Sequence, residues 1–164
     1  MTETEELATA LVACLVEKGL TLAAAESCTG GWIAKAITDV AGSSACFGYG
    51  IVSYSNDAKM RLLNVSSSLL GEHGAVSEPV VQAMAGGALR ISDADVAVAV
   101  SGIAGPGGGS ADKPVGTVWL AYAVRSQAGP GTQTECMHFD GDRHDVRQQT
   151  VLHALRTLLA TLRK

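Results

Sequence analysis

The residues best suited to chemistry lie in a short polar stretch near the amino end, Glu26–Gly31, which reads Glu-Ser-Cys-Thr-Gly-Gly. Ser27, Cys28 and Thr29 each offer a nucleophile or a hydrogen-bond donor. The stretch follows a short apolar run, 21–25, of the length of a buried strand. It precedes apolar residues that recur at helical spacing: Trp32, Ile33, Ala36, Ile37 and Val40. We therefore interpret the stretch as a strand-to-helix turn.

Such a turn would direct free backbone N–H groups and the positive end of the following helix toward a ligand. Its two glycines, Gly30 and Gly31, would let that ligand come close to the backbone. A simpler interpretation is that Ser27 or Thr29 only caps the helix, as serine and threonine commonly do. The stretch by itself leaves both interpretations open.

A lysine stands at an unusual position in another predicted helix. The residues 55–57, Ser-Asn-Asp, supply N-cap candidates for a short helix that contains Lys59. A positive side chain in the first turns opposes the helix dipole, so stability alone would favour an acidic residue there. The position indicates a lysine with a function or, as for most lysines, one that is simply solvated.

A glycine-rich loop, Gly102–Ser110, follows the most apolar predicted strand, Asp95–Ser101. The Val/Ala run of that strand is typical of a central strand covered on both faces. Open α/β sheets bind ligands at the carboxyl ends of their strands, which makes the loop a second candidate site element. It has neither the Gly-Lys-Ser/Thr ending of a P-loop nor the glycine spacing of a dinucleotide fingerprint, so we expect neither a nucleoside triphosphate nor NAD.

The pattern along the rest of the chain predicts an α/β fold. Helices are expected over 2–18, 32–40, 55–63, 77–89 and 140–164, with a short turn over 66–70. Strands are expected over 21–25, 47–54, 95–101, 115–125 and 132–139, the last two as an antiparallel hairpin. We therefore expect one domain, 1–164, built as a three-layer α/β/α sandwich around a mixed sheet.

Composition argues against several classes of protein. Hydrophobic residues make up 47% of the 164 residues and charged residues 17%, which suits one compact core. A net charge of −4 without a cluster of Lys and Arg argues against nucleic-acid binding. No apolar run approaches the ~20 residues of a membrane helix, and the acidic amino end lacks the positive region of a secretory signal. We expect a soluble, cytoplasmic protein without a membrane partner.

The cysteines and histidines indicate neither disulfides nor a metal site. The four cysteines form no Cys-x-x-Cys pair, and a domain with a sufficient core does not need disulfides, so we expect reduced thiols. The four histidines do not combine with these cysteines at the spacing of zinc ligands. The residues concerned are Cys14, Cys28, Cys46, Cys136, His73, His138, His144 and His153.

Six short blocks in order along the chain are distinctive when taken together. They are Ala25-Glu-Ser-Cys-Thr-Gly-Gly31, Tyr54-Ser-Asn-x-x-Lys59, Gly74-Ala-Val-Ser-x-Pro79, Ser101-Gly-Ile-Ala-Gly-Pro106, Lys113-Pro-Val-Gly-Thr117 and Gly141-Asp-Arg143. With these blocks the chain resembles the CinA carboxyl-terminal domain family from about residue 5 to residue 160. It looks like the stand-alone form, a nicotinamide-nucleotide amidase without the separate amino-terminal domain of longer members.

The resemblance implies hydrolysis of the carboxamide of nicotinamide mononucleotide to nicotinate mononucleotide and ammonia, which returns pyridine nucleotide to NAD synthesis. It implies Ser27 as the nucleophile and Lys59 as its partner, with no metal or organic cofactor. A neutral lysine can take the proton of a serine and later protonate departing ammonia. Because the ordinary lysine pKa is about 10.4, we expect Lys59 to be desolvated or to lie near positive charge, and the helix N-terminus near Lys59 would also lower its pKa.

The same resemblance matches the functional arginine of the family to Arg143, with Arg147 one helical turn further on as the alternative. This arginine would hold the substrate phosphate. Backbone N–H groups around Cys28 and Thr29, or in the glycine-rich loop, would form an oxyanion hole. We assign substrate contacts to the turn, the strand ends and the loop: Cys28, Thr29, Gly30, Gly31, Tyr54, Ser101, Gly102 and Gly105.

Two alternatives remain for the function. The first is a cysteine amidase that uses Cys28, since thiolates are better nucleophiles and a helix N-terminus lowers their pKa. Without the resemblance, the residues favour Ser27 and Cys28 almost equally; with it, Ser27 leads. The second is a non-catalytic nucleotide-binding module in which the glycine loops cradle phosphate and Lys59 is a charge partner. In each case we expect a homo-oligomer, because small domains with weakly charged surfaces often self-associate.

Overall fold

The computed structural model of the chain describes residues 1–129 and 131–164. At its centre is a five-stranded sheet in the order β2-β1-β3-β4-β5. β1 pairs in parallel with both β2 and β3, whereas β3 with β4 and β4 with β5 pair antiparallel. The strands are β1 (Leu22–Glu26), β2 (Phe47–Val52), β3 (Val96–Gly102), β4 (Thr117–Val124) and β5 (Gly131–His138). The predicted mixed sheet, central strand and hairpin are all confirmed.

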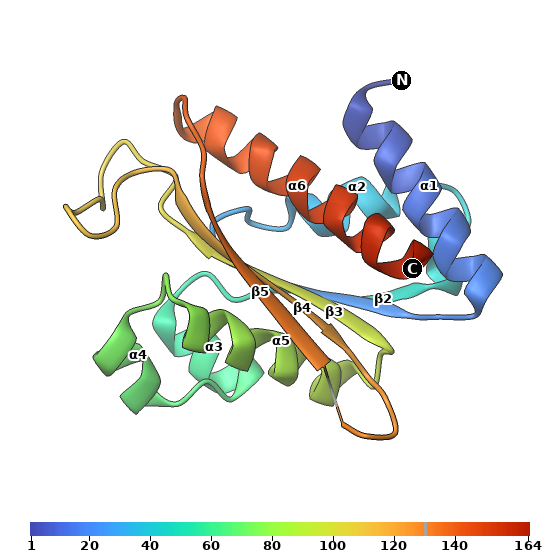
Figure 1. Cartoon of the computed structure of the whole chain (residues 1–164), viewed down its shortest axis with the longest axis horizontal. Helices are drawn as coiled ribbons and strands as arrows, with labels where there is room; N and C mark the ends of the chain where they lie inside the picture. The colour runs from blue at the N-terminus through green and yellow to red at the C-terminus, as the bar shows by residue number, and fades with distance from the viewer. Residues whose placement is uncertain (130) are drawn as a thin grey trace.

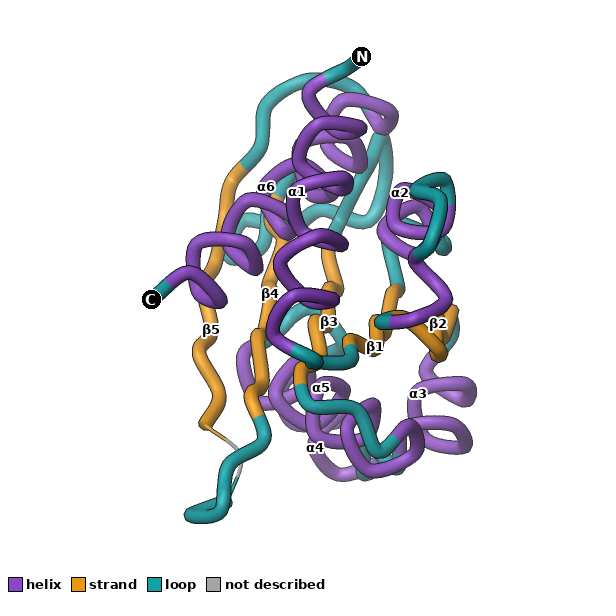
Figure 2. The backbone as a smooth tube through the Cα atoms, turned by 90° about the vertical axis from the view of Figure 1, so that its right-hand side faces the viewer, coloured by secondary structure: helices purple, strands orange, loops and turns teal. Residues whose placement is uncertain are grey.

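Helices cover both faces of this sheet (Figure 1). One face carries α1 (Glu3–Lys18), α2 (Trp32–Thr38) and α6 (Arg143–Arg163). The other carries α3 (Asn56–Leu63), α4 (Ser67–His73) and α5 (Glu78–Ser92). The turned view shows β2 and β5 at the two edges of the sheet (Figure 2). This is the predicted three-layer α/β/α sandwich. In the described part of the chain, no helix has the length and apolar character needed to cross a membrane.

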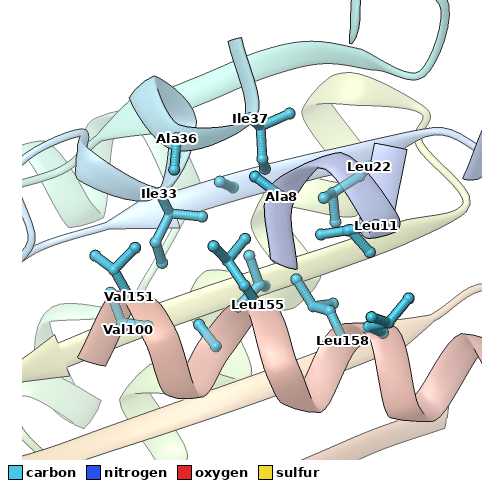
Figure 3. Packing of buried hydrophobic residues seen from close by; sticks show 14 of the residues in the cluster. Ala8, Leu11, Leu22, Ile33, Ala36, Ile37, Val100, Val151, Leu155 and Leu158 are labelled. Atoms are coloured by element: carbon cyan, nitrogen blue, oxygen red, sulfur yellow. The ribbon is translucent and has the colours of Figure 1, made fainter. Parts of the chain in front are cut away.

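The two faces of the sheet bury side chains of different size because successive residues of a strand point to opposite sides. In β3, Val96, Val98 and Val100 belong to the core under α1, α2 and α6, whereas Ala97 and Ala99 face α5. Figure 3 shows Leu155 and Leu158 of α6 within the first core. The alanines on the other face let α5 pack close to the sheet.

The polar residues at helix ends explain most of the element boundaries. Thr2 and Glu5 form the predicted capping box of α1, and Ser55 accepts the predicted capping hydrogen bond of α3 from Ala58 N–H. Ser77 stands at the predicted N-cap of α5, but its hydroxyl donates to the Gly74 carbonyl and does not cap the helix. The second strand is shorter than predicted and ends at Val52, which leaves Tyr54 in a loop.

The order of connections opens a crevice at one end of the sheet. The chain leaves β1 for β2 through α2 on one face and returns from β2 to β3 through α3, α4 and α5 on the other. The carboxyl ends of β1 and β3 therefore lie at a topological switch point, where open α/β sheets bind ligands. The polar turn after β1 and the glycine-rich loop after β3 meet there.

Two neighbouring glycines of α5 give a matched test of its packing against α3. A Cβ at Gly87 would lie 2.2 Å from the Leu63 carbonyl oxygen, whereas Gly86 has no neighbouring atom within 4 Å. Gly86→Ala should stabilise by up to ~1 kcal/mol through helix propensity. Gly87→Ala should destabilise by about 1–3 kcal/mol because α3 must move. Urea denaturation measures both, and equal stability of the two variants would contradict this contact.

Candidate active site

The carboxyl ends of the three parallel strands surround a pocket of about 210 Å³. Ser27 follows β1, Tyr54 follows β2, Ser101 and Gly102 end β3, and Arg143 begins α6. The pocket therefore brings together residues from both faces of the sheet. It is lined by Ser27, Cys28, Tyr54, Asn56, Lys59, Ala75, Val76, Ser101, Gly102, Ala104 and Arg143.

Ser27 and Lys59 form a direct pair in this pocket. The Lys59 Nζ lies 2.8 Å from the Ser27 Oγ, although 32 residues separate them in the sequence. The same Nζ lies 2.9 Å from the Ser53 carbonyl oxygen and 3.2 Å from that of Tyr54. A nitrogen held by two carbonyl oxygens and one hydroxyl has a defined orientation toward the serine.

Lys59 is not a solvated lysine, because only 1% of its surface is exposed. Burial lowers the pKa of Lys59 from its ordinary value of 10.5, because an ammonium group loses hydration in the interior. Nearby Cys28 acts in the opposite direction to a smaller extent. The expected direction of the pKa shift is therefore confirmed, and of the two expected causes burial is the main one.

The turn after β1 is organised by Glu26, a residue that we did not predict as part of the site. Its fully buried carboxylate accepts hydrogen bonds from the Thr29 hydroxyl at 2.6 Å, Ile33 N–H at 2.9 Å and Ala34 N–H at 3.0 Å. The expectation that α2 presents a free positive end to a ligand is therefore wrong, because this carboxylate already occupies it. An acidic residue shortly before a helix start is the signal that could have revealed it.

Neither hydroxyl of the turn caps α2. Thr29 donates its hydroxyl to Glu26, and the Ser27 Oγ lies between Lys59 Nζ and, at 3.4 Å, the Tyr54 carbonyl oxygen. The simpler capping interpretation is therefore wrong. The backbone N–H groups of Ser27 and Gly30 donate to the carbonyl oxygens of Val100 and Ser27, whereas those of Cys28, Thr29 and Gly31 find no hydrogen-bond partner among the described residues. Two of these three free N–H groups belong to the residues that directly follow Ser27.

The Cys28 side chain is poorly suited to act as a nucleophile. It is packed into the core formed with α1, α2 and α6. Burial raises the pKa of this thiol from 9.0 to about 11, so that it stays protonated at neutral pH. The Cys28 backbone N–H and, to a smaller extent, the nearby Arg147 and Lys59 charges act in the opposite direction and do not overcome burial. The geometry therefore favours Ser27 over Cys28.

The two candidate arginines take different positions. Arg143 donates to the Gly105 carbonyl oxygen at 2.8 Å and to the Tyr54 hydroxyl at 3.0 Å, and it lines the pocket of Ser27 and Lys59. Arg147 does not line that pocket. Both arginines line a neighbouring pocket of about 500 Å³, together with Ala104, Pro106, Val115, Gly141, Asp142 and His144. Arg143 therefore connects the two spaces.

Most predicted site residues come together, but part of the turn does not. Thr29, Gly30 and Gly31 line a separate pocket with Trp32, Lys35 and Arg147. Asn56 and the residues Ala75 and Val76 line the serine pocket without having been predicted, although they lie within conspicuous sequence blocks. Among the described residues, no group of three or more His, Cys, Asp or Glu side chains is arranged to hold a metal ion.

Comparison with known proteins shows which family this chain is similar to. A family model described as the CinA C-terminal domain matches residues 4–162. The chain is 54% identical over 160 residues to the nicotinamide-nucleotide amidohydrolase PncC of Escherichia coli strain K12, covering 96% of this chain and 95% of that protein. It is also 56% identical to a putative competence-damage inducible protein of Symbiobacterium thermophilum. That match covers 92% of this chain and 37% of the longer protein.

A solved structure shows the same fold. The competence/damage inducible protein of Agrobacterium tumefaciens superposes with a TM-score of 0.93 at 46% sequence identity, with 100% of this chain and 98% of that chain covered. The family match extends over nearly the whole chain and includes every block that contributes to the serine pocket. The chain therefore belongs to the CinA C-terminal domain family.

Proposed function

We propose that this chain is an amidohydrolase that converts nicotinamide mononucleotide to nicotinate mononucleotide and ammonia and thereby serves pyridine nucleotide salvage. The observation that carries the proposal is the contact of 2.8 Å between Ser27 Oγ and a buried Lys59 whose pKa is lowered. The substrate follows from similarity to the PncC protein, which is named a nicotinamide-nucleotide amidohydrolase. A lysine that served only to bind phosphate would need to be charged and accessible, and Lys59 is 1% exposed.

The first step is attack of Ser27 on the carboxamide carbon. A neutral amine has two hydrogens and one lone pair, and the carbonyl oxygens of Ser53 and Tyr54 can accept the two hydrogens. The lone pair then faces the Ser27 hydroxyl and takes its proton as the oxygen bonds to carbon. The product of this step is a tetrahedral oxyanion next to an ammonium group on Lys59.

The oxyanion needs hydrogen-bond donors that are already in place. We assign this role to the backbone N–H groups of Cys28 and Thr29, which directly follow Ser27 and have no partner within the described residues. Lys59 next returns its proton to the amide nitrogen, the C–N bond breaks, and ammonia leaves an ester on Ser27. A water molecule that gives its proton to Lys59 attacks the ester, and the returned proton restores the Ser27 hydroxyl.

The nucleotide part of the substrate requires a local positive charge, because the net charge of −4 repels an anion. Arg143 lies between the serine pocket and the neighbouring pocket of about 500 Å³. Its guanidinium has five donors, and the two bonds to Gly105 and Tyr54 leave others for a phosphate. We assign the carboxamide to the serine pocket and the phosphate to the Arg143 side.

The nucleophile is tested by a matched pair of neighbouring substitutions. Ser27→Ala should abolish ammonia release from nicotinamide mononucleotide because it removes the attacking oxygen. Cys28→Ala should retain substantial activity because the Cys28 thiol stays protonated. Steady-state ammonia assays measure both variants, and circular dichroism checks the fold. The opposite pattern would assign the reaction to Cys28.

Lys59→Met keeps the length of the side chain and removes the base, so turnover should fall by about 10²–10⁴-fold with little change in substrate affinity. Activity requires neutral Lys59, so kcat/KM should rise with pH through a pKa below the ordinary 10.5. This acidic limb should be absent from the residual activity of the variant. Near-wild-type turnover of Lys59→Met would refute the assignment.

Arg143→Ala should weaken catalytic efficiency on the mononucleotide by about 2–5 kcal/mol, the range for loss of one partner of a desolvated charge pair. Activity on the riboside, which lacks the phosphate, should hardly change. Assays of both substrates and a thermal melt separate the possible roles. Equal losses on both substrates would place Arg143 at the reacting amide if the melt is unchanged, or in support of the fold if it is lowered.

A further inference from the structure

Arg147 holds the outer side of the turn that carries Ser27. Its Nε donates to the Cys28 carbonyl oxygen at 3.0 Å, and its Nη2 donates to the Thr29 carbonyl oxygen at 3.2 Å. The guanidinium lies 5.6 Å from the centroid of the Trp32 ring. Among the described residues it forms no ion pair with a carboxylate. Its charge is therefore directed at the backbone carbonyls of the turn.

The first of these contacts fixes the direction of the Thr29 N–H. In a trans peptide the C=O and N–H groups point in opposite directions. The peptide bonds of this turn are trans, since the one cis bond found in the described residues is Gly105–Pro106. The Cys28 carbonyl and the Thr29 N–H belong to the same peptide unit. Because Arg147 holds that carbonyl, the Thr29 N–H must point away from Arg147.

The second contact, from Arg147 to the Thr29 carbonyl, acts on the Cys28 N–H through one further hydrogen bond. The Thr29 carbonyl shares a peptide unit with the Gly30 N–H, which donates to the Ser27 carbonyl oxygen at 3.1 Å. The Ser27 carbonyl in turn shares a peptide unit with the Cys28 N–H. The Cys28 and Thr29 N–H groups therefore each end a line of aligned peptide dipoles that begins at the Arg147 guanidinium. Hydrogen bonds arranged in such a line polarise one another.

We propose that Arg147 is a positioning residue that orients and polarises the Cys28 and Thr29 N–H groups toward the oxyanion. It does so from behind the turn, without contact with the reacting atoms. The inference rests on the proposed function, since an oxyanion forms only if Ser27 attacks a carbonyl. Glu26 holds the Thr29 hydroxyl from the inner side, and the Trp32 N–H also donates to the Thr29 carbonyl oxygen. A chain without the Arg147 guanidinium therefore keeps the turn, but it loses the bond that restrains the Cys28 carbonyl and one of the two bonds that restrain the Thr29 carbonyl.

The test compares two substitutions of Arg147 with a matched control on the same helix. Arg147→Met should lower kcat by about 10–100-fold, less than the 10²–10³-fold that accompanies loss of a whole donor, with KM within about threefold. Arg147→Lys should restore only part of this loss, because an ammonium cannot reproduce the planar fork. Arg156→Met removes an exposed arginine that pairs with Glu3 and should leave kcat unchanged.

A substrate with sulfur in place of the carboxamide oxygen reports on the oxyanion donors, because sulfur is a weak hydrogen-bond acceptor. Wild type should strongly prefer the oxygen substrate, and Arg147→Met should reduce that preference at least severalfold. A merely structural role would lower both rates equally and would overturn the inference. A loss confined to KM for the mononucleotide, and absent for the riboside, would make Arg147 a phosphate ligand and would also overturn it.

A second readout separates this inference from the proposed substrate. A phosphonofluoridate phosphonylates an activated serine by displacing fluoride, and its P=O oxygen needs the same donors. If wild type releases no ammonia but Ser27 is labelled, the substrate assignment is wrong. The labelling rate of Arg147→Met then decides the inference about Arg147 by itself. Labelling of Arg147→Met should be at least severalfold slower, and an equal rate overturns the inference. A wild type that shows neither ammonia release nor labelling overturns both proposals.

Discussion

The structure of the site depends on the burial of one lysine amine beside a hydroxyl. Lys59 is 1% exposed and its Nζ contacts the Ser27 hydroxyl and the carbonyl oxygens of Ser53 and Tyr54. An isolated buried charge is costly, so burial favours the neutral amine, and the two carbonyls remain satisfied by its hydrogens. This arrangement requires the carboxyl ends of β1 and β2 to lie side by side, as their parallel pairing ensures.

The turn that carries Ser27 is held by two opposite charges on its two sides. Glu26 accepts the Thr29 hydroxyl and the first free N–H groups of α2, and Arg147 donates to the Cys28 and Thr29 carbonyls. Together they satisfy the polar groups of a turn that is tightly packed against the core. Within the described residues, the N–H groups of Cys28, Thr29 and Gly31 have no partner. The Thr29 N–H shares a peptide unit with a carbonyl that Arg147 holds, and the Cys28 N–H shares one with the Ser27 carbonyl, which accepts from Gly30 N–H.

The site also joins the two helical layers. Lys59 comes from α3 on one face of the sheet, and Arg143 comes from the start of α6 on the other. The capping box of Asp142 and Asp145 begins α6 where Arg143 can reach Tyr54 and Gly105. A substrate with an amide at one end and a phosphate at the other can therefore contact both layers at once.

Local patterns in the sequence determined the elements and the identity of the chemical groups. The capping residues Thr2 and Ser55, the apolar periodicity around the turn and the Val/Ala run of β3 predicted the order and type of the elements, because each depends on neighbours a few residues away. The Ser27 and Lys59 blocks were recognisable because each is a run of a few consecutive residues.

Only the tertiary structure decided which groups meet. The buried carboxylate of Glu26, the contact across 32 residues between Ser27 and Lys59, and the outward position of Gly30 and Gly31 all depend on strand pairing and layer packing. Arg143 and Arg147 are identical in type and lie one turn apart, about 6 Å along the helix. Their separate roles follow from where the α6 axis rests on the sheet, a position set by the core beneath it and by no local pattern.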